Sequence, residues 1–243
     1  LIFIIIFSIS TPYVIARNKK KYDNYWEKIK QFEEKDLPYS SLQEVEKVYQ
    51  LAEKEKNNQQ IIKALIYDFK YSSMLSSEAI EQSIKKIENT ISKTKDQVTL
   101  AILHTMLSEK YLEYCYLNNF QLNARKPIIN YIPEDIKNWS ENIFIQKFYE
   151  NMDAALSYHH VLKKTSTKNY DEIFKIGEDS KDLRPSMYDF ISYRFLNFLN
   201  NYQFVLERNE LIINTNWIDK SQEIYSNLIL FHEKDKKKEA YIY

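Results

Sequence analysis

One glycine, Gly177, occurs in the 243 residues of this chain. Globular proteins contain about 7% glycine, because tight turns and left-handed helix ends often need a residue without a side chain. Hairpin-rich β folds and the Gly-rich loops of Rossmann and P-loop enzymes would lack their usual turn residue here. The scarcity of glycine therefore favours helices joined by loops of Asn, Asp and Pro.

Apolar residues recur at steps of three or four after Tyr22, which is the spacing of one helical face. The pattern predicts helices over residues 22–37, 41–56, 59–74, 77–93, 98–117, 133–156, 170–176, 186–202 and 218–232. Short connections favour antiparallel neighbours. We expect an all-α chain of about nine or ten helices, in which antiparallel helix hairpins stack as a tetratricopeptide-like α-solenoid.

An irregular segment near residues 120–132 is expected to interrupt this array. Its apolar residues suggest a buried, extended stretch: Ile128, Ile129, Tyr131 and Ile132. Pro133 is followed by two acidic residues, which suits a helix opening. The helix that we expect from there to residue 156 would turn four large residues inward: Trp139, Phe144, Phe148 and Met152.

Residues 1–16, "LIFIIIFSISTPYVIA", form a separate unit before a basic run. They fit a signal peptide that is truncated at its start and cleaved after Ala16. A membrane span is the alternative, but spanning needs about 20 apolar residues and this run is interrupted after Ile9. The pattern therefore predicts an exported protein of the periplasm or cell envelope.

Lys plus Arg and Asp plus Glu both number 34, so the formal net charge is zero. Such a chain has no overall field that attracts nucleic acid or anionic lipid. We therefore expect protein partners and no nucleic acid, with membrane contact only through export or association with the envelope. The 20 Tyr and 13 Phe residues are expected to fill spaces between helices.

The residues that could carry chemistry are few. The chain has four histidines: His104, His159, His160 and His232. The adjacent pair would point to different faces of a helix, and His232 has one carboxylate at ligand spacing, Asp235. Cys115 lies in an apolar run and is expected to be a small buried filler. We therefore assign no catalytic residue, metal site or cofactor, and expect that the protein is not an enzyme.

The stretch "KIGEDSKDLRPSMYDF", residues 175–190, leads from a charged loop into a helix. Asp179, Asp182 and Arg184 could form the rim of an active site. Alternatively, Pro185 stands at the first helical position, Asp182 accepts from first-turn amides, and Arg184 makes a structural ion pair. We favour the structural role for all three residues.

Several segments together resemble a known family. "YDNYWEKIKQFEEKDLPYSSLQEVEKVYQLAEKEKN", "IIKALIYDFKY", "ILHTMLSEKYLEYCYLNN", "PEDIKNWSENIF" and "DLRPSMYDFISYRFLNF" resemble, in this order, the helical N-terminal region of the large alpha-2-macroglobulin-like proteins of Bacteroidetes-type bacteria. The resemblance implies an exported envelope protein whose later domains trap proteases. It also implies that residues 17–243 are a helical N-terminal domain, incomplete at its C-terminal end. The thioester motif of the Cys-Gly-Glu-Gln type is absent, since Cys115 lies between two tyrosines.

Two functions follow as expectations. The first is a non-catalytic helical scaffold or interaction module at the N-terminus of such a protease-trapping protein, with its own downstream domains or envelope proteins as partners. The alternative is a free-standing periplasmic tetratricopeptide-like adaptor that binds an envelope protein or peptide. A hydrolase is a distant third.

Overall fold

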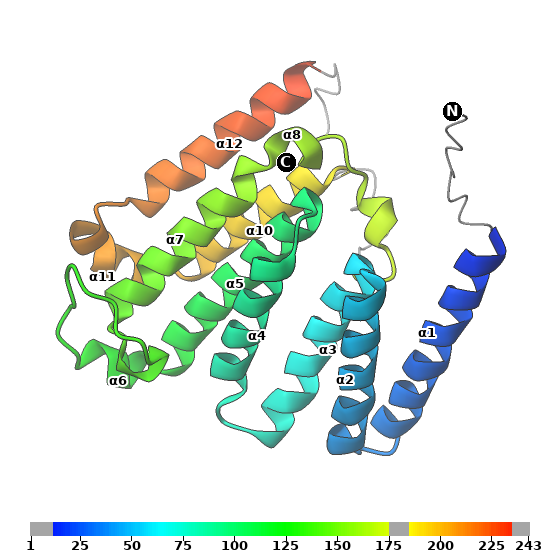
Figure 1. Ribbon diagram of the computed structural model, residues 1–243. Coiled ribbons are helices and arrows are strands. Elements are labelled where there is room, and N and C mark those ends of the chain that lie inside the picture. Colours follow the sequence, from blue (N-terminus) through cyan, green and yellow to red (C-terminus); the bar gives the residue numbers. More distant parts are fainter. Residues whose placement is uncertain (1–11, 175–184, 235–243) are drawn as a thin grey trace, which may run out of the picture. The chain divides into compact units, whose positions relative to one another are not determined.

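The computed structural model describes residues 12–174 and 185–234 (Figure 1). These residues form eleven α-helices and two short 3-10 helices, and they contain no strand. The all-α prediction is confirmed for this part of the chain. Among the helices described, none combines the length and the apolarity that crossing a membrane requires.

The chain divides into two compact units, residues 1–79 and 80–243. In the first unit each helix packs against the next one in sequence: α1 (Pro12–Glu33), α2 (Pro38–Glu55) and α3 (Asn58–Leu75) (Figure 1). The hydroxyl of Tyr22 donates to Glu55 at 2.9 Å, and that of Tyr71 donates to Glu33 at 3.0 Å. These bonds let the buried tyrosines contribute apolar area to the core while their polar ends stay paired.

The start of α2 differs from the prediction. The helix begins with Pro38 in its first turn, whereas the expected opening was Ser41. Proline suits this position because its fixed backbone angle matches the helix and its missing N–H would have no helical partner there. The hydroxyl of Ser41 instead bonds to the carbonyl of Leu37.

Non-glycine residues make the tight backbone turns. Among the residues described, four have positive φ angles: Asp36, Lys56, Asn130 and Asn214. Asn and Asp tolerate this left-handed conformation better than other side chains do. Lys56, the C-cap of α2, does not share that tolerance, and its φ is 54°. The described loops thus turn without glycine, and the left-handed conformation of Lys56 lowers the stability of the fold locally.

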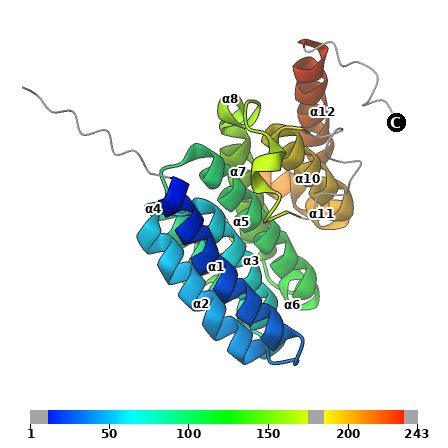
Figure 2. The same cartoon turned by 90° about the vertical axis from the view of Figure 1, so that its right-hand side faces the viewer.

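The second unit contains α4 from its second residue (Ala79–Lys93), α5 (Gln97–Leu117), α6 (Asn119–Asn123), α7 (Glu141–Ser157), α8 (His159–Leu162), α10 (Met187–Asn201), α11 (Gln203–Ile213) and α12 (Trp217–Lys234). Helix α5 packs closely on α7, and α10 contacts both of them (Figure 2). Helix α11 contacts α7, and α12 packs on α10 and α11. The packing therefore goes beyond a chain of sequential hairpins.

Aromatic residues fill the spaces between these helices, as expected. The rings of Tyr114 and Phe144 stack at 4.5 Å between α5 and α7, and those of Phe148 and Phe195 meet at 6.4 Å between α7 and α10. The four residues that were expected to face inward are all buried: Trp139, Phe144, Phe148 and Met152.

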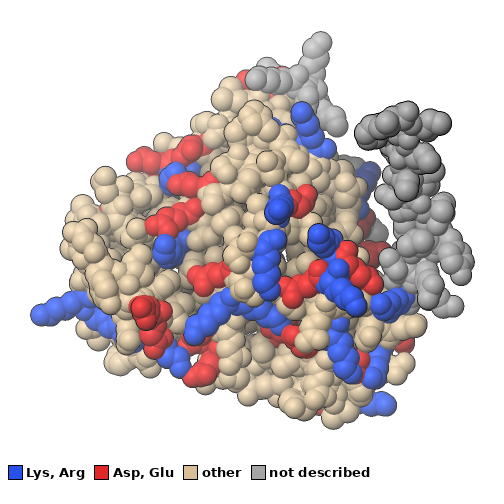
Figure 3. Space-filling model, viewed as in Figure 1, with Lys and Arg blue, Asp and Glu red and all other residues tan. Residues whose placement is uncertain are grey.

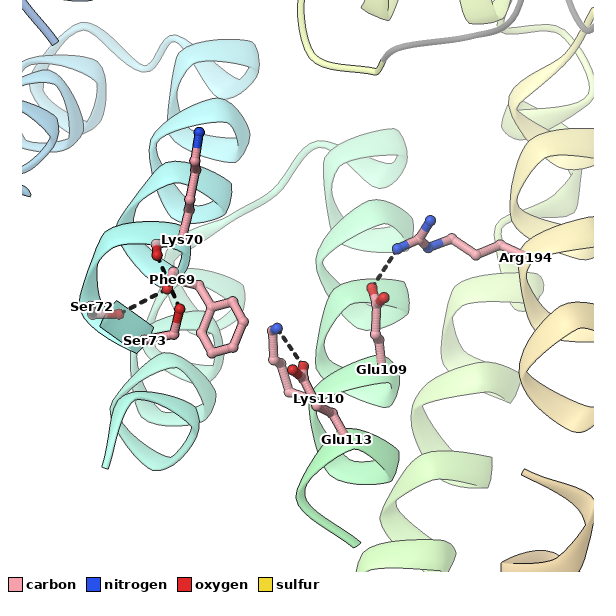
Figure 4. Close-up of polar contacts among 8 residues, drawn as sticks. All are labelled: Phe69, Lys70, Ser72, Ser73, Glu109, Lys110, Glu113 and Arg194. Carbon is pink, nitrogen blue, oxygen red and sulfur yellow. Dashed lines mark hydrogen bonds and ion pairs between the residues drawn. The ribbon is translucent and has the colours of Figure 1, made fainter. Parts of the chain in front are cut away.

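Ion pairs connect the outer parts of the same helices. Arg194 on α10 reaches Glu109 on α5 at 2.5 Å, and Lys110 pairs with Glu113 one turn further along α5 at 2.7 Å (Figure 4). Figure 4 also shows α3 of the first unit, where the Ser72 hydroxyl bonds back to the carbonyl of Phe69. A serine near a helix end satisfies its hydroxyl locally in this way.

The segment between α6 and α7 is irregular, as expected, but it is not buried. Ile129 is 70% exposed and Tyr131 66% exposed, and Asn130 interrupts any extended strand with its positive φ. The prediction of a buried stretch was wrong because α5 and α7 contact each other directly, so their connection runs over the surface.

The helix that was expected to start at Pro133 begins later. Asp135 caps only a 3-10 turn (Ile136–Asn138), Trp139 is extended, and α7 starts after Ser140. The indole N–H of Trp139 donates to the carbonyl of Pro133 at 2.7 Å, which folds the chain back on itself before α7 begins.

Two further elements differ from the expected ones. The short helix expected at 170–176 is a 3-10 turn at Thr167–Tyr170, and residues from 175 lie outside the described part. Helix α11 was not predicted at all. One residue, Tyr202, separates it from α10, and a polar residue, Asn209, occupies one of its three buried positions. The sequence therefore shows neither a helix-breaking segment before α11 nor a regular stripe of apolar residues along it.

Candidate functional site

The predicted site residues have different outcomes. Ala16 lies within the range of α1, and cleavage after it stays a prediction. Asp182 and Arg184 lie outside the described residues. Pro185 precedes the N-cap of α10, so its expected place as the first helical residue was wrong. The carbonyl of Pro185 accepts from the backbone N–H of Thr167 at 3.0 Å, which joins two loops.

This junction has two more parts. Ser166 and Ser186 form an isolated antiparallel bridge, and the N–H of Met187 donates to the carbonyl of Thr165 at 2.8 Å. The segment that follows α8 and the segment that precedes α10 therefore meet at one point and are joined there by backbone hydrogen bonds.

A capping box opens α10. The Ser186 hydroxyl oxygen accepts from the Asp189 N–H at 3.2 Å, and Asp189 Oδ2 accepts from the Ser186 N–H at 3.1 Å. The pair satisfies two backbone donors that the helix leaves unpaired at its start. Its signal in the sequence, Ser-x-x-Asp before an apolar run, was present and was overlooked.

The same Asp189 carboxylate contacts a histidine from the end of the described chain. Oδ1 of Asp189 lies 2.6 Å from Nε2 of His232, and Oδ2 accepts from the Ser186 hydroxyl at 2.7 Å. Asp189 is fully buried. A nucleophilic serine needs contact with a base, usually histidine, but Ser186 contacts the acid instead. The arrangement is therefore suited to joining α10 to α12, not to acyl transfer.

The other histidines and the cysteine lie apart from this cluster. Nδ1 of His104 lies 2.7 Å from Oδ1 of Asn151, between α5 and α7. The rings of His159 and His160 lie 4.0 Å apart, so the expectation that they point to different faces was wrong. The short α8 ends within a few residues, which lets adjacent side chains converge. Across residues 12–174 and 185–234, no His, Cys, Asp or Glu residues group as a metal site.

Cys115 is completely buried, as expected. Burial raises the pKa of its thiol well above the usual value, and the negative charge of Glu141 adds to the shift, although Arg208 opposes it. A thiol that stays protonated at neutral pH is a poor nucleophile. Cys115 therefore acts as a small apolar residue in the core.

A cleft of about 550 Å³ lies in the second unit, between α7, α8, α10 and α12. Its size is within the range of about 300–1,000 Å³ that ligand sites occupy. Apolar side chains line part of it, including Leu156 and Ile224, and Asn227 lies among them. No pattern in the sequence marks this cleft, because its lining comes from four separate helices.

Charged residues stand at both ends of the cleft. The Lys220 ammonium pairs with Asp153 at 3.0 Å and with Glu223 at 3.2 Å. Burial alone would lower the pKa of Lys220, but its bonds to Asp153 and Glu223 outweigh burial and raise it. The ammonium of Lys163 lies 4.6 Å from the ring centroid of Tyr188. The face of the Tyr188 ring thus attracts this positive charge just after α8.

A second candidate site is an exposed apolar surface where α5, α6 and α11 meet. We call it the apolar end surface. Its members are large and exposed: Tyr116, Leu117, Phe120, Ile129, Tyr131, Ile132, Phe204 and Leu211. Phe120 is 92% exposed and Leu211 is 99% exposed.

One arginine holds the elements of this surface together. Arg208 on α11 donates to Asn119 on α6 at 3.0 Å and to Glu141 at the start of α7 at 2.5 Å. The Arg208 guanidinium also lies 4.7 Å from the ring centroid of Phe204. Next to it, the N–H of Ile128 donates to Asn142, which places the exposed loop beside the start of α7.

Figure 3 shows Lys and Arg interspersed with Asp and Glu on the face in view, without a large area of one sign, so charge does not single out a binding surface on that face. Comparison with protein-family models, with curated proteins and with solved structures finds no match.

Proposed function

We propose that this chain is a non-catalytic helical scaffold that binds other proteins, and that the apolar end surface is its principal contact. The observation that carries the proposal is the exposure of eight large apolar side chains on α5, α6, α11 and the segment before α7, whose elements the bonds of Arg208 and Asn142 hold together. Contiguous exposed apolar patches on soluble proteins mark interaction sites more often than chance.

The composition of this surface supports a protein partner. Tyr and Phe are enriched at protein interfaces, and arginine often anchors them. The bonds of Arg208 to α6 and α7 fix its guanidinium, so little side-chain freedom is lost when a partner covers Phe204. The chain has no net charge, and on the face shown in Figure 3 the charges are mixed and form no basic stripe that would attract a nucleic acid.

The proposal includes a setting. We place the chain at the N-terminus of an exported alpha-2-macroglobulin-like protein of the periplasm or cell envelope, as one helical domain over residues 17–243 after a signal peptide that is cleaved behind Ala16. Its own downstream domains or envelope proteins are then the partners. The ordered segments of the resemblance support this setting, and the sequential packing of α1, α2 and α3 supports a tetratricopeptide-like arrangement in the first unit.

The alternative is a free-standing periplasmic adaptor that binds an envelope protein or peptide. The exposed stripe of α12, which includes Tyr225 and Ile229, favours it, because an adaptor uses more than one face. The DNA after Tyr243 discriminates between the two. Continuation into β-sandwich domains supports the first function, and a stop codon supports the second.

The test of the proposed contact uses two variants, Phe120→Asp and Leu211→Asp, and a control, Tyr39→Asp, at an exposed position on α2 outside both surfaces. Each tagged protein is incubated with envelope extract and cross-linked, and the captured proteins are quantified by mass spectrometry. We expect both surface variants to lose at least about tenfold of specific capture, since charge at an interface centre costs several kcal/mol. Equal capture by Phe120→Asp and the unmodified protein, with equal thermal melts, would contradict the proposal.

A further inference from the structure

We propose that α12 acts as a lid of the second unit: it undocks from α10 and swings about residues 214–216, while the other helices of the unit stay folded. The movement opens the cleft that α12 borders together with α7, α8 and α10. The lid includes none of the residues of the apolar end surface. The inference therefore goes beyond the proposed function and does not depend on it.

The first observation is how little of α12 is buried. Between positions 217 and 233, the buried residues are Ile224, Leu228 and His232, one on each successive turn. Helices α5, α7 and α10 each bury more than half of their residues. Segments with few buried apolar side chains open at a lower cost in free energy than the core of the same protein. Of these four helices, α12 is therefore the one that opens most readily.

The second observation is the position of the cleft. Ile224 and Asn227 line it from α12, and Met152 and Leu156 line it from α7. Side chains that face each other across an open space of about 550 Å³ lose the dispersion attraction that close packing gives. The cleft thus reduces the attraction between α12 and α7, so less of it is lost when α12 moves.

The third observation is a hinge between α11 and α12. Asn214 has a left-handed backbone with φ 52°, and the side chain of Asn216 accepts from first-turn backbone N–H groups of α12 at 2.8 and 3.2 Å. Asn216 also donates to Glu210 on α11 at 3.2 Å, and Arg208 bonds α11 to α6 and α7. Because α11 is fixed and α12 has its own cap, the backbone angles of the short connection take up the movement.

The fourth observation is a latch at the far end of α12. Nε2 of His232 lies 2.6 Å from Oδ1 of the buried Asp189, and the ring of Phe231 meets that of Tyr188 edge to face at 5.6 Å. Both partners lie in the first turn of α10. These contacts hold α12 at the end that a swing about residues 214–216 moves furthest. Loss of the His232 bond should therefore release the lid.

Hydrogen exchange of the full chain, followed by mass spectrometry, tests the lid. We expect the amides of residues 220–230 to exchange at least about tenfold faster than those in the middle of α5, α7 and α10, because a helix owes most of its stability to packing. His232→Ala should speed exchange in α12 at least about fivefold further, as the loss of one buried hydrogen bond does, and leave α5 and α7 unchanged. His104→Ala, which removes a bond to Asn151 between α5 and α7, is the matched control and should leave α12 unchanged.

A second measurement separates opening of the lid from unfolding of the whole unit. In Leu228→Cys the new thiol lies on the buried face of α12, and Cys115, buried in α5, is the reference in the same molecule. We expect N-ethylmaleimide to label position 228 at least about tenfold faster than Cys115. Equal labelling of the two thiols, or no effect of His232→Ala on exchange in α12, would overturn the inference. Fast exchange confined to residues 231–234 would also overturn it, because that is fraying of the helix end.

Discussion

Nε2 of His232 lies 2.6 Å from Oδ1 of Asp189, so a bond across 43 residues of sequence joins α12 to the first turn of α10. The carboxylate is fully buried, and its other oxygen is engaged by Ser186. Removing the histidine leaves a buried carboxylate short of a partner, and such a loss costs far more than a surface contact does.

We therefore expect His232→Ala to lower the free energy of unfolding by about 1–3 kcal/mol, which is the cost of leaving a buried hydrogen-bonding group without its partner. His160→Ala, at an exposed position, is the control and should change it by less than about 0.5 kcal/mol. Urea unfolding followed by circular dichroism measures both. A loss below about 1 kcal/mol for His232→Ala would show that the bond contributes little.

Lys56→Gly should stabilise the protein. Lys56 has φ 54° at the end of α2, a conformation that costs a residue with a side chain about 1–2 kcal/mol and glycine almost nothing. After the entropy of glycine is subtracted, a gain of about 0.5–1 kcal/mol remains, seen as a higher melting temperature. Lys54→Gly, in the same helix but with helical geometry, should instead destabilise it by about 0.5–1 kcal/mol. Equal effects of the two changes would refute the explanation.

Stability should fall at alkaline pH because of the buried tyrosines. Burial raises the pKa of Tyr170 to about 12, with the charge of Asp96 adding to the shift. The unfolded chain loses this proton from about pH 10 upward, while the folded protein keeps it. Unfolding then releases protons, so stability is complete below about pH 10 and falls by up to about 1.4 kcal/mol per pH unit per such group above it.

The measurement is tyrosinate absorbance recorded together with the helical circular dichroism signal. We expect a late absorbance rise above about pH 11 that coincides with loss of helix, because burial also raises the pKa of Tyr111 and Tyr149. A Tyr170→Phe variant should unfold at a slightly higher pH. Complete titration of all tyrosines with the helices intact would contradict the prediction.

Cys115 should resist alkylation in the folded protein. Its thiol is buried and its pKa is raised, so both access and thiolate formation are unfavourable. At pH 8, N-ethylmaleimide should leave intact protein unlabelled for hours and label it within minutes in 6 M guanidinium. Mass spectrometry measures the added mass. Rapid labelling without denaturant would mean that α5 opens locally far more often than its packing indicates.

Cleavage after Ala16 is tested on the protein from its native envelope. We expect the mature N-terminus to be Arg17, because Val14-Ile15-Ala16 precedes a basic run as at signal peptidase sites. Mass spectrometry of the N-terminal peptide shows whether the mature chain begins at Arg17. Recovery of peptides that contain residues 1–16 would favour a membrane anchor instead.

Local signals in the sequence predicted the helices well and their connections poorly. The spacing of Phe144, Phe148 and Met152 identified the inward face of α7, because that face depends only on helical geometry. The late start of α7 depends on the Trp139 bond to Pro133, and the exposure of Ile129 depends on how α5 meets α7. No local pattern contains that information.

The candidate sites were still less predictable. Ser186 and Asp189 form a local capping box that could have been recognised, but the contact of Asp189 with His232 arises only when α12 packs on α10. The same holds for the cleft and for the grouping around Arg208, since each combines residues from three or more elements.

The junction at Thr165, Thr167, Pro185 and Met187 has a practical consequence. Both of its hydrogen bonds run between backbone groups, so a side-chain substitution at any of these four positions leaves the donors and acceptors in place. Proline is the exception at Thr167 and Met187, because it has no backbone N–H to donate. Surface mutagenesis at this junction can therefore vary the side chains freely while the two loops stay joined.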